Sequence, residues 1–196
     1  MRRRRRRKRR PLSPPGLEQL EAELRRETDK KQYERSIFYT ACLLAAAAAC
    51  VVLAVELWLP VLKIQGSSMA PALKDGEVVM AVKTSRANPG DIIAFSQDGR
   101  LLIKRVIADG GDWVDIEEDG TVYVNGMELD EPYLTERSAG KMDMEFPCQV
   151  PEGKLFVLGD HRCASVDSRS SAVGFVDEGQ IIGRLILRIW PLGSIR

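Results

Sequence analysis

Two residue types in this chain can together generate a nucleophile: a serine in a glycine-rich turn and a lysine in an apolar run. The turn is IQGSSMAPAL at residues 64–73, and it offers two adjacent hydroxyls, Ser67 and Ser68. A serine hydroxyl is a poor nucleophile at neutral pH unless a neighbouring base removes its proton. The alternative interpretation of the turn is an ordinary Gly/Ser/Pro loop.

The base that such a serine requires is best sought among the lysines, because the chain has a single histidine, His161. One histidine also argues against a zinc site and a Ser-His-Asp triad. A lysine acts as a base only where burial lowers its pKa from about 10.4 toward about 7–8. Lys104 lies in the apolar run LLIKRVIA, residues 101–108. The alternative is that Lys104 and Arg105 form a surface pair on a strand edge.

The elements that would position these residues are short strands. Segments rich in Val, Ile and Leu are bounded by Asp-Gly, Asn-Gly, Pro-Gly and Gly-Gly pairs, which favour turns. Asp98-Gly99 and Asp119-Gly120 each join two apolar runs as in a β-hairpin. No helical pattern alternates with these runs, so we predict a mainly β, antiparallel barrel or sandwich. The expected strands are 77–84, 91–97, 101–108, 112–118, 121–126, 154–160 and 181–190, with a long loop over 127–150.

The N-terminal region has a different composition. Residues 1–36 carry 14 Lys and Arg against 6 Asp and Glu, whereas the remaining 160 residues carry 15 against 22. Residues 37–55 form an uncharged run of 19 residues. As a helix, this run is long enough to cross the ~30 Å hydrocarbon core of a bilayer. We therefore predict one transmembrane helix over 37–57, preceded by a basic tail and a juxtamembrane helix within 1–36.

The charge asymmetry also predicts an orientation in the cell membrane. The positive-inside rule places residues 1–36 in the cytoplasm and residues 58–196 outside it. The alternatives are a buried soluble helix and a cleavable signal peptide, whose positive region would be unusually long. The basic run in residues 2–10 most simply holds this topology and touches anionic lipid, with nucleic-acid binding as the alternative. Cys148 and Cys163 lie in the exported part, where a disulfide can persist.

Four segments carry a resemblance to a known family. They are GSSMAPAL (66–73), PGDIIAF (89–95), KRVIADGGD (104–112) and GDHRCASVDSRSSAVGFV (159–176), in this order after one apolar helix. With these segments the chain resembles the bacterial type I signal peptidases, membrane-anchored serine proteases that remove signal peptides from exported proteins. The four segments span most of residues 60–185, and their combination is specific, whereas any one alone is weak.

The resemblance implies a catalytic domain of the signal-peptidase, LexA-like type and hydrolysis through an acyl-enzyme, without metal or cofactor. The family's nucleophile directly precedes a Met, so it maps to Ser68 and not to Ser67, and the lysine base maps to Lys104. The Ser68 N–H would be one oxyanion donor. Gly66 stands where some relatives have a serine hydroxyl, so a backbone group must serve there.

The same resemblance assigns supporting residues and specificity. Ser165 maps to a hydroxyl that orients the lysine, and Asp167 and Arg169 map to an ion pair that holds the shape of the site. The family cleaves after Ala-x-Ala, which requires shallow apolar pockets, and a substrate bound as an added strand would fit an exposed sheet edge. The residues that map to the pocket-lining segments, each equally compatible with plain core, are Ile64, Met69, Leu73, Ala94 and Ile103.

Some features depart from the family pattern. His161 replaces the usual Asn of Gly-Asp-Asn and is interpreted as a hydrogen-bonding loop residue, and Cys163 is unusual in its segment. The expected partners are preprotein signal peptides, the lipid bilayer and the secretion translocon, with no nucleic acid. Two alternatives stay open: a self-cleaving protease like the LexA-type repressors, against which the anchor argues, and a non-enzymatic, membrane-anchored module that binds peptides.

Overall fold

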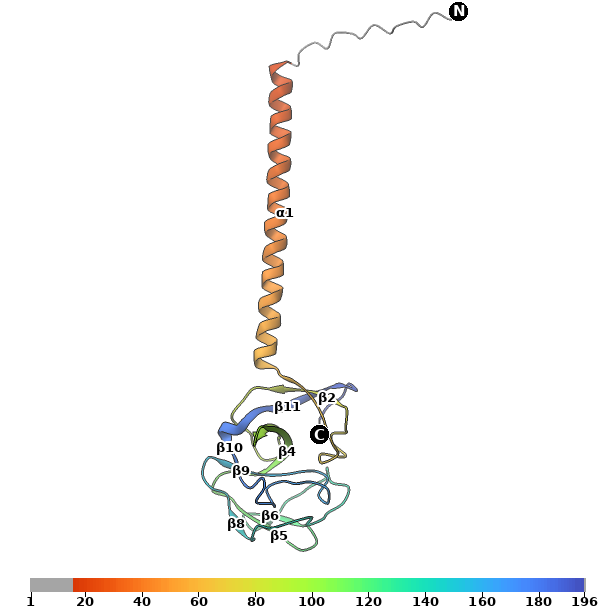
Figure 1. Cartoon of the computed structure of the whole chain (residues 1–196), viewed down its shortest axis with the longest axis vertical. Helices are drawn as coiled ribbons and strands as arrows, with labels where there is room; N and C mark the ends of the chain where they lie inside the picture. Colours follow the sequence, from red (N-terminus) through yellow and green to blue (C-terminus); the bar gives the residue numbers. More distant parts are fainter. Residues whose placement is uncertain (1–15, 196) are drawn as a thin grey trace, which may run out of the picture. The chain divides into compact units, whose positions relative to one another are not determined.

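The N-terminal part of the chain is a single long helix. The computed structural model describes residues 16–195, which divide into two compact units at Val52 and Leu53. Helix α1 (Leu17–Trp58) has 42 residues (Figure 1). The predicted juxtamembrane and transmembrane helices are therefore one continuous element. The basic run in residues 2–10, on which the predicted orientation depends, lies outside the described residues.

Helix α1 exposes its apolar side chains. Every side chain described between Leu17 and Trp58 is exposed, including the large apolar ones that follow residue 36. Soluble monomers rarely leave so much contiguous apolar surface uncovered. Among the described residues, α1 is the one helix that is long and apolar enough to cross a membrane. Its length and composition therefore suit a membrane anchor.

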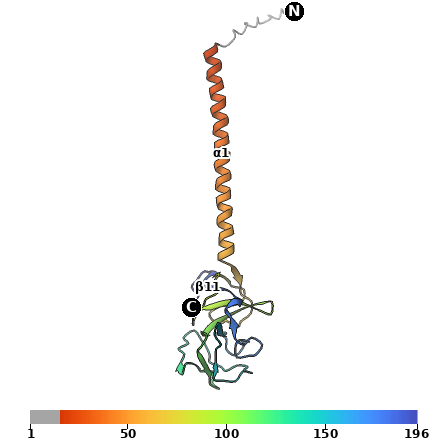
Figure 2. The ribbon, with the colours of Figure 1, turned by 90° about the vertical axis from the view of Figure 1, so that its left-hand side faces the viewer.

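The second unit consists of two antiparallel sheets (Figures 1 and 2). The larger sheet has seven strands in the order β1-β2-β11-β3-β4-β9-β10, and the smaller has four in the order β7-β6-β5-β8. The strands of the larger sheet are β1 (Val61–Lys63), β2 (Val78–Val82), β3 (Ile92–Gln97), β4 (Arg100–Ala108), β9 (Lys154–Leu158), β10 (Val176–Asp177) and β11 (Ile181–Trp190). Those of the smaller sheet are β5 (Trp113–Ile116), β6 (Val122–Val124), β7 (Met127–Glu128) and β8 (Cys148–Gln149), and a short 3₁₀ helix, η1 (Glu178–Gln180), precedes β11.

The predicted fold class is confirmed in its sandwich-like form. The larger sheet ends at β1 and β10 and does not close into a barrel. All seven predicted strands are present, and Asp98 and Gly99 both have positive φ in the tight β3–β4 turn. The Asp119-Gly120 pair lies in the β5–β6 hairpin, as predicted. The region predicted as a long loop, 127–150, is mostly irregular but contributes β7 and β8 to the smaller sheet.

Strand β4 connects the parts of this unit and changes character along its length. Its first half is partly exposed, whereas the side chains from Lys104 to Ala108 are all buried. On one side, β3 pairs with β4 from Arg100 to Arg105. On the other side, β9 pairs with β4 only from Arg105 onward. On the side of β4 away from β3, residues 100–104 therefore form a sheet edge that pairs with no strand among the described residues.

Candidate active site

Lys104 is a buried lysine that makes no ion pair with a carboxylate of residues 16–195. Its residue exposure is 3%, and its Nζ donates a hydrogen bond to the Ser165 Oγ at 2.9 Å. Burial is the main cause that lowers the pKa of Lys104, and the nearby Arg169 lowers it further. Asp167 and Asp160 act in the opposite direction, but they do not cancel the effect of burial. A lowered pKa favours the neutral amine, which is the form that a general base requires.

Ser68 lies at the other wall of the groove that contains Lys104. Both residues line one groove of about 500 Å³, between the segment that follows β1 and the free edge of β4. The Ser68 carbonyl accepts a hydrogen bond from the His161 N–H at 3.0 Å. The His161 Nδ1 also lies 3.2 Å from the Ser67 carbonyl oxygen. His161 thus holds the serine turn through its backbone, which agrees with its interpretation as a hydrogen-bonding loop residue.

Gly159 brings the serine turn and the lysine together. A Cβ at this position would collide with the Ser165 side chain and with the Ser68 carbonyl oxygen. Because residue 159 has no side chain, both the Ser68 carbonyl and the Ser165 side chain, which accepts the Lys104 hydrogen bond, can lie against its backbone. Gly159 is the first residue of the segment 159–176, but no local pattern in the sequence distinguishes it as a site residue.

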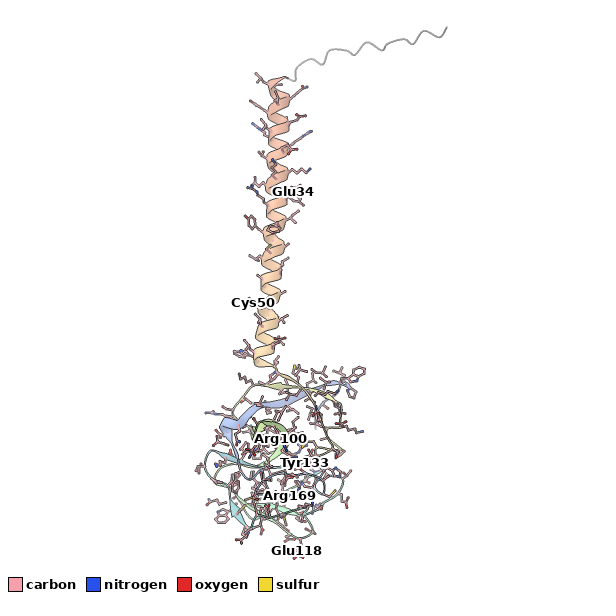
Figure 3. The ribbon with its side chains drawn as sticks, in the orientation of Figure 1. Glu34, Cys50, Arg100, Glu118, Tyr133 and Arg169 are labelled. Carbon is pink, nitrogen blue, oxygen red and sulfur yellow. The ribbon has the colours of Figure 1, made fainter. Side chains whose placement is uncertain are left out.

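Asp167 and Arg169 form a buried ion pair beneath the site. The Arg169 Nε and Nη2 donate to the two Asp167 carboxylate oxygens at 2.8 and 2.9 Å. Asp167 also accepts the Gly159 N–H at 3.0 Å, and Arg169 donates to the backbone carbonyls of Ser138, Ala139 and Arg162. The pair therefore fixes the loop that carries Ser165. Figure 3 shows Arg169 in the strand-containing unit, together with Arg100 and Tyr133.

Gly66 shapes the turn ahead of Ser68. It has a φ of +86°, a conformation that favours glycine, and its N–H donates to the Asp75 Oδ1 at 2.7 Å. The Gly66 N–H is therefore already used in a hydrogen bond and is not free to donate to an oxyanion. The Ser68 N–H has no hydrogen-bond partner within residues 16–195, which leaves it available as an oxyanion donor.

The predicted pocket residues divide into two groups. Ile64, Met69 and Ile103 line the groove. Leu73 and Ala94 are fully buried in the core cluster behind it and do not line the groove. Sequence reasoning missed several other residues of the groove, because polar or partly exposed positions give no pocket signal: Lys63, Gln65, Arg100, Leu101 and Leu102.

A second buried charge network stands behind the site. Arg105 donates two hydrogen bonds to Asp160, at 2.9 and 2.7 Å, and lies 3.9 Å over the ring of Tyr133. The Tyr133 hydroxyl donates to Glu131 at 2.7 Å, and Glu131 forms a buried ion pair with Arg162. Sequence reasoning missed this network because Glu131 and Tyr133 lie in the region predicted as a loop.

The two cysteines outside helix α1, Cys148 and Cys163, are both free thiols. Cys163 is exposed and Cys148 is partly buried. The structure therefore contains no disulfide between them, and burial raises the pKa of the Cys148 thiol.

Comparisons with known proteins show similarity to one family. A sequence profile of the family described as "Signal peptidase, peptidase S26" matches residues 36–190. The chain is 36% identical over 181 residues to Signal peptidase I U of Bacillus subtilis (strain 168), which covers 86% of this chain and 95% of that protein. It is 37% identical over 153 residues to Signal peptidase IB of Staphylococcus aureus (strain Mu50 / ATCC 700699), which covers 68% of this chain and 78% of that protein.

A solved structure of a signal peptidase I from Enterococcus faecalis V583 is 34% identical to this chain. The match has a TM-score of 0.44 and covers 51% of this chain and 97% of that structure. The profile alone spans well over half of the chain, and the two relatives match it over most of their own lengths. The chain therefore belongs to the signal peptidase family, peptidase S26.

Proposed function

We propose that this chain is a type I signal peptidase that cleaves exported preproteins after Ala-x-Ala, with Ser68 as nucleophile and Lys104 as general base. The observation that carries the proposal is the state of Lys104. It is buried, it donates a hydrogen bond only to a hydroxyl within the described residues, and it shares a groove with Ser68. A lysine that were only structural would be expected to have a carboxylate partner.

The reaction runs through an acyl-enzyme. Lys104 takes the proton of the Ser68 hydroxyl as its Oγ attacks the scissile carbonyl carbon, and the Ser68 N–H donates to the resulting oxyanion. The tetrahedral intermediate collapses with cleavage of the C–N bond, and Lys104 returns the proton to the leaving amine. Lys104 then removes a proton from water as its oxygen attacks the ester carbonyl carbon. The bond between that carbon and the Ser68 Oγ breaks, and Lys104 passes the proton to Oγ, which restores both residues.

The groove suits an extended peptide. The β4 edge at residues 100–104 has no strand partner, and the Gln65 backbone on the opposite wall makes no hydrogen bond to the described residues. A substrate strand inserted between the two would gain main-chain hydrogen bonds from both walls. Ile64, Met69 and Ile103 would then supply shallow apolar pockets for the two alanines.

The anchor completes the proposal. We infer that α1 crosses the cell membrane with residues 1–36 in the cytoplasm and the strand-containing unit outside, where preproteins emerge. The lipid bilayer, signal peptides and the translocon would be the partners. Fusion of a reporter that is active on only one side of the membrane to the C-terminus tests this orientation directly.

The test of the function is cleavage of a purified preprotein by the full chain in detergent micelles. We expect a product that ends in Ala-x-Ala, lost in Ser68→Ala and in Lys104→Met and retained in the matched control Ser67→Ala. Equal cleavage by Ser68→Ala would exclude this nucleophile. Tight binding of a signal peptide without cleavage by any form would instead support a peptide-binding module.

A further inference from the structure

The charge of the groove is one-sided. Among the eleven residues that line it are three basic ones, Lys63, Arg100 and Lys104, and no Asp or Glu. Lys104 is buried, whereas Lys63 and Arg100 are exposed. We propose that Lys63 and Arg100 form a cationic subsite that selects substrates with an acidic side chain several residues ahead of the scissile bond. This inference rests on the proposed function and specifies its substrates further.

Lys63 and Arg100 lie on opposite walls of the groove, both displaced from the catalytic pair. Arg100 begins β4, four residues before Lys104, which corresponds to about 13 Å along the strand. Because side chains alternate along a strand, Arg100 projects from the same face of β4 as Lys104. Lys63 ends β1 and precedes Ser68 by five residues.

Both charges are available to a ligand. Neither Lys63 nor Arg100 makes an ion pair or a side-chain hydrogen bond to any described residue. The Asp75 carboxylate accepts the Gly66 N–H, and Asp98 in the β3–β4 turn makes no ion pair with Arg100. Arg105 offers a contrast, because Asp160 already neutralises it. A substrate carboxylate would therefore be the first anionic partner of this cationic pair.

The position of the subsite on the substrate follows from the pockets. Ile64, Met69 and Ile103 receive the residues that directly precede the cut. Ile64 lies in sequence between Lys63 and Ser68, and Ile103 lies between Arg100 and Lys104, whereas Met69 directly follows Ser68. An extended peptide advances about 3.3 Å per residue. The cationic pair therefore faces the region about four to six residues before the scissile bond. A basic side chain at this place would be repelled.

The experiment compares matched preproteins that differ only at one of these positions, with Glu, Gln or Lys, cleaved by the full chain in detergent micelles. At low salt we expect kcat/KM to decrease in the order Glu, Gln, Lys, with about a three- to tenfold span at the most sensitive position. High salt should compress the span, because the pair is exposed. In the double variant Lys63→Glu and Arg100→Glu, the order should invert. The control Arg86→Glu, an exposed residue that does not line the groove, should keep the wild-type order.

The outcomes separate this inference from the function on which it rests. Failure of the wild type to cleave even the Gln preprotein would contradict the proposed function. Equal cleavage of the Glu, Gln and Lys preproteins at low salt would overturn the subsite and leave the proposed function intact. A defect of the double variant that appears only in vesicles with anionic lipid, whatever the substrate charge, would also overturn it and assign the pair to lipid headgroups.

Discussion

Lys104 and Arg105 are neighbouring basic residues on β4 with 3% and 5% exposure, but their side chains have different hydrogen-bond partners. Lys104 donates to the hydroxyl of Ser165. Arg105 donates two hydrogen bonds to the carboxylate of Asp160 and stacks over Tyr133. Burial lowers the pKa of Lys104. Burial alone would also lower the pKa of Arg105, but its hydrogen bond and ion pair with Asp160 raise it.

The difference shows that the hydrogen-bond partner of a buried Lys or Arg side chain, and not its burial, decides whether its pKa is lowered or raised. Loss of solvation disfavours the charged form of both side chains. A carboxylate within hydrogen-bond distance restores the charged form, whereas a hydroxyl orients the amine without compensating its charge. Under the proposed function, one strand would supply a general base and a structural cation at adjacent positions, because successive side chains of a strand point to opposite faces of the sheet.

The largest effect is expected when Lys104 is made a permanent cation. Arginine cannot lose its proton near neutral pH, so Lys104→Arg should reduce kcat by about 10² to 10⁴, as should Lys104→Met. Preprotein cleavage under single-turnover conditions measures this loss. Near-UV circular dichroism of Lys104→Met provides the control for folding. Substantial activity in Lys104→Arg would show that the position does not act as a base.

The next largest effect is expected on stability, when Arg105 loses its carboxylate partner Asp160. Asp160→Asn leaves the Arg105 charge buried without its carboxylate, which should lower the free energy of unfolding by about 3–5 kcal/mol. Urea unfolding of the full chain in detergent, followed by tryptophan fluorescence, measures the change. The matched control is Glu128→Gln, which breaks the exposed pair with Arg137 and should cost less than about 1 kcal/mol. Equal costs for the two variants would contradict the structural role of Asp160.

A smaller effect is expected from Ser165→Ala. The variant removes the oxygen that accepts the Lys104 hydrogen bond, so the amine loses orientation and kcat should fall by about tenfold with little change in KM. The charged ammonium also loses an acceptor, which should lower the pKa of Lys104 further and move the acidic limb of the pH–kcat profile to lower pH. A limb that moves to higher pH would contradict this arrangement.

The smallest effect is on the pH dependence of stability. The pKa of Lys104 is lower in the folded than in the unfolded chain, so the unfolded chain binds more protons between the two values. Stability should therefore rise with pH through this window and stay at its lower level below it. Lys104→Met should be more stable than wild type at neutral pH and lack this rise. Urea unfolding at several pH values, with Lys63→Met as the exposed control, checks the sign.

The fold was predictable where local signals are strong. The long strands alternate with Asp-Gly and similar turns, and each was predicted within a few residues. Strands β1, β7, β8 and β10 were not predicted, because each has only two or three residues and shows no periodicity. The continuity of α1 was also not predicted, because its charged and apolar halves have different compositions.

The site was only partly predictable from local sequence. The apolar run around Lys104 indicates burial, but its contact with Ser165 joins residues 61 positions apart, and only the family resemblance suggested it. Leu73 and Ala94 could not be separated from the groove residues, because core and shallow pocket require the same apolar side chains. The pairing of Glu131 with Arg162 depends on how the smaller sheet packs, which no local pattern encodes.

The most direct test of Lys104 as the general base is the pH dependence of kcat/KM for the wild type with a substrate that does not titrate in the range studied. We predict a single acidic limb whose midpoint lies below 10.5, the ordinary pKa of a lysine side chain. Activity should rise with pH through this midpoint as Lys104 loses its proton, and the residual activity of Lys104→Met should lack the limb. A limb at or above 10.5, or the same limb in Lys104→Met, would contradict the assignment of Lys104 as the base.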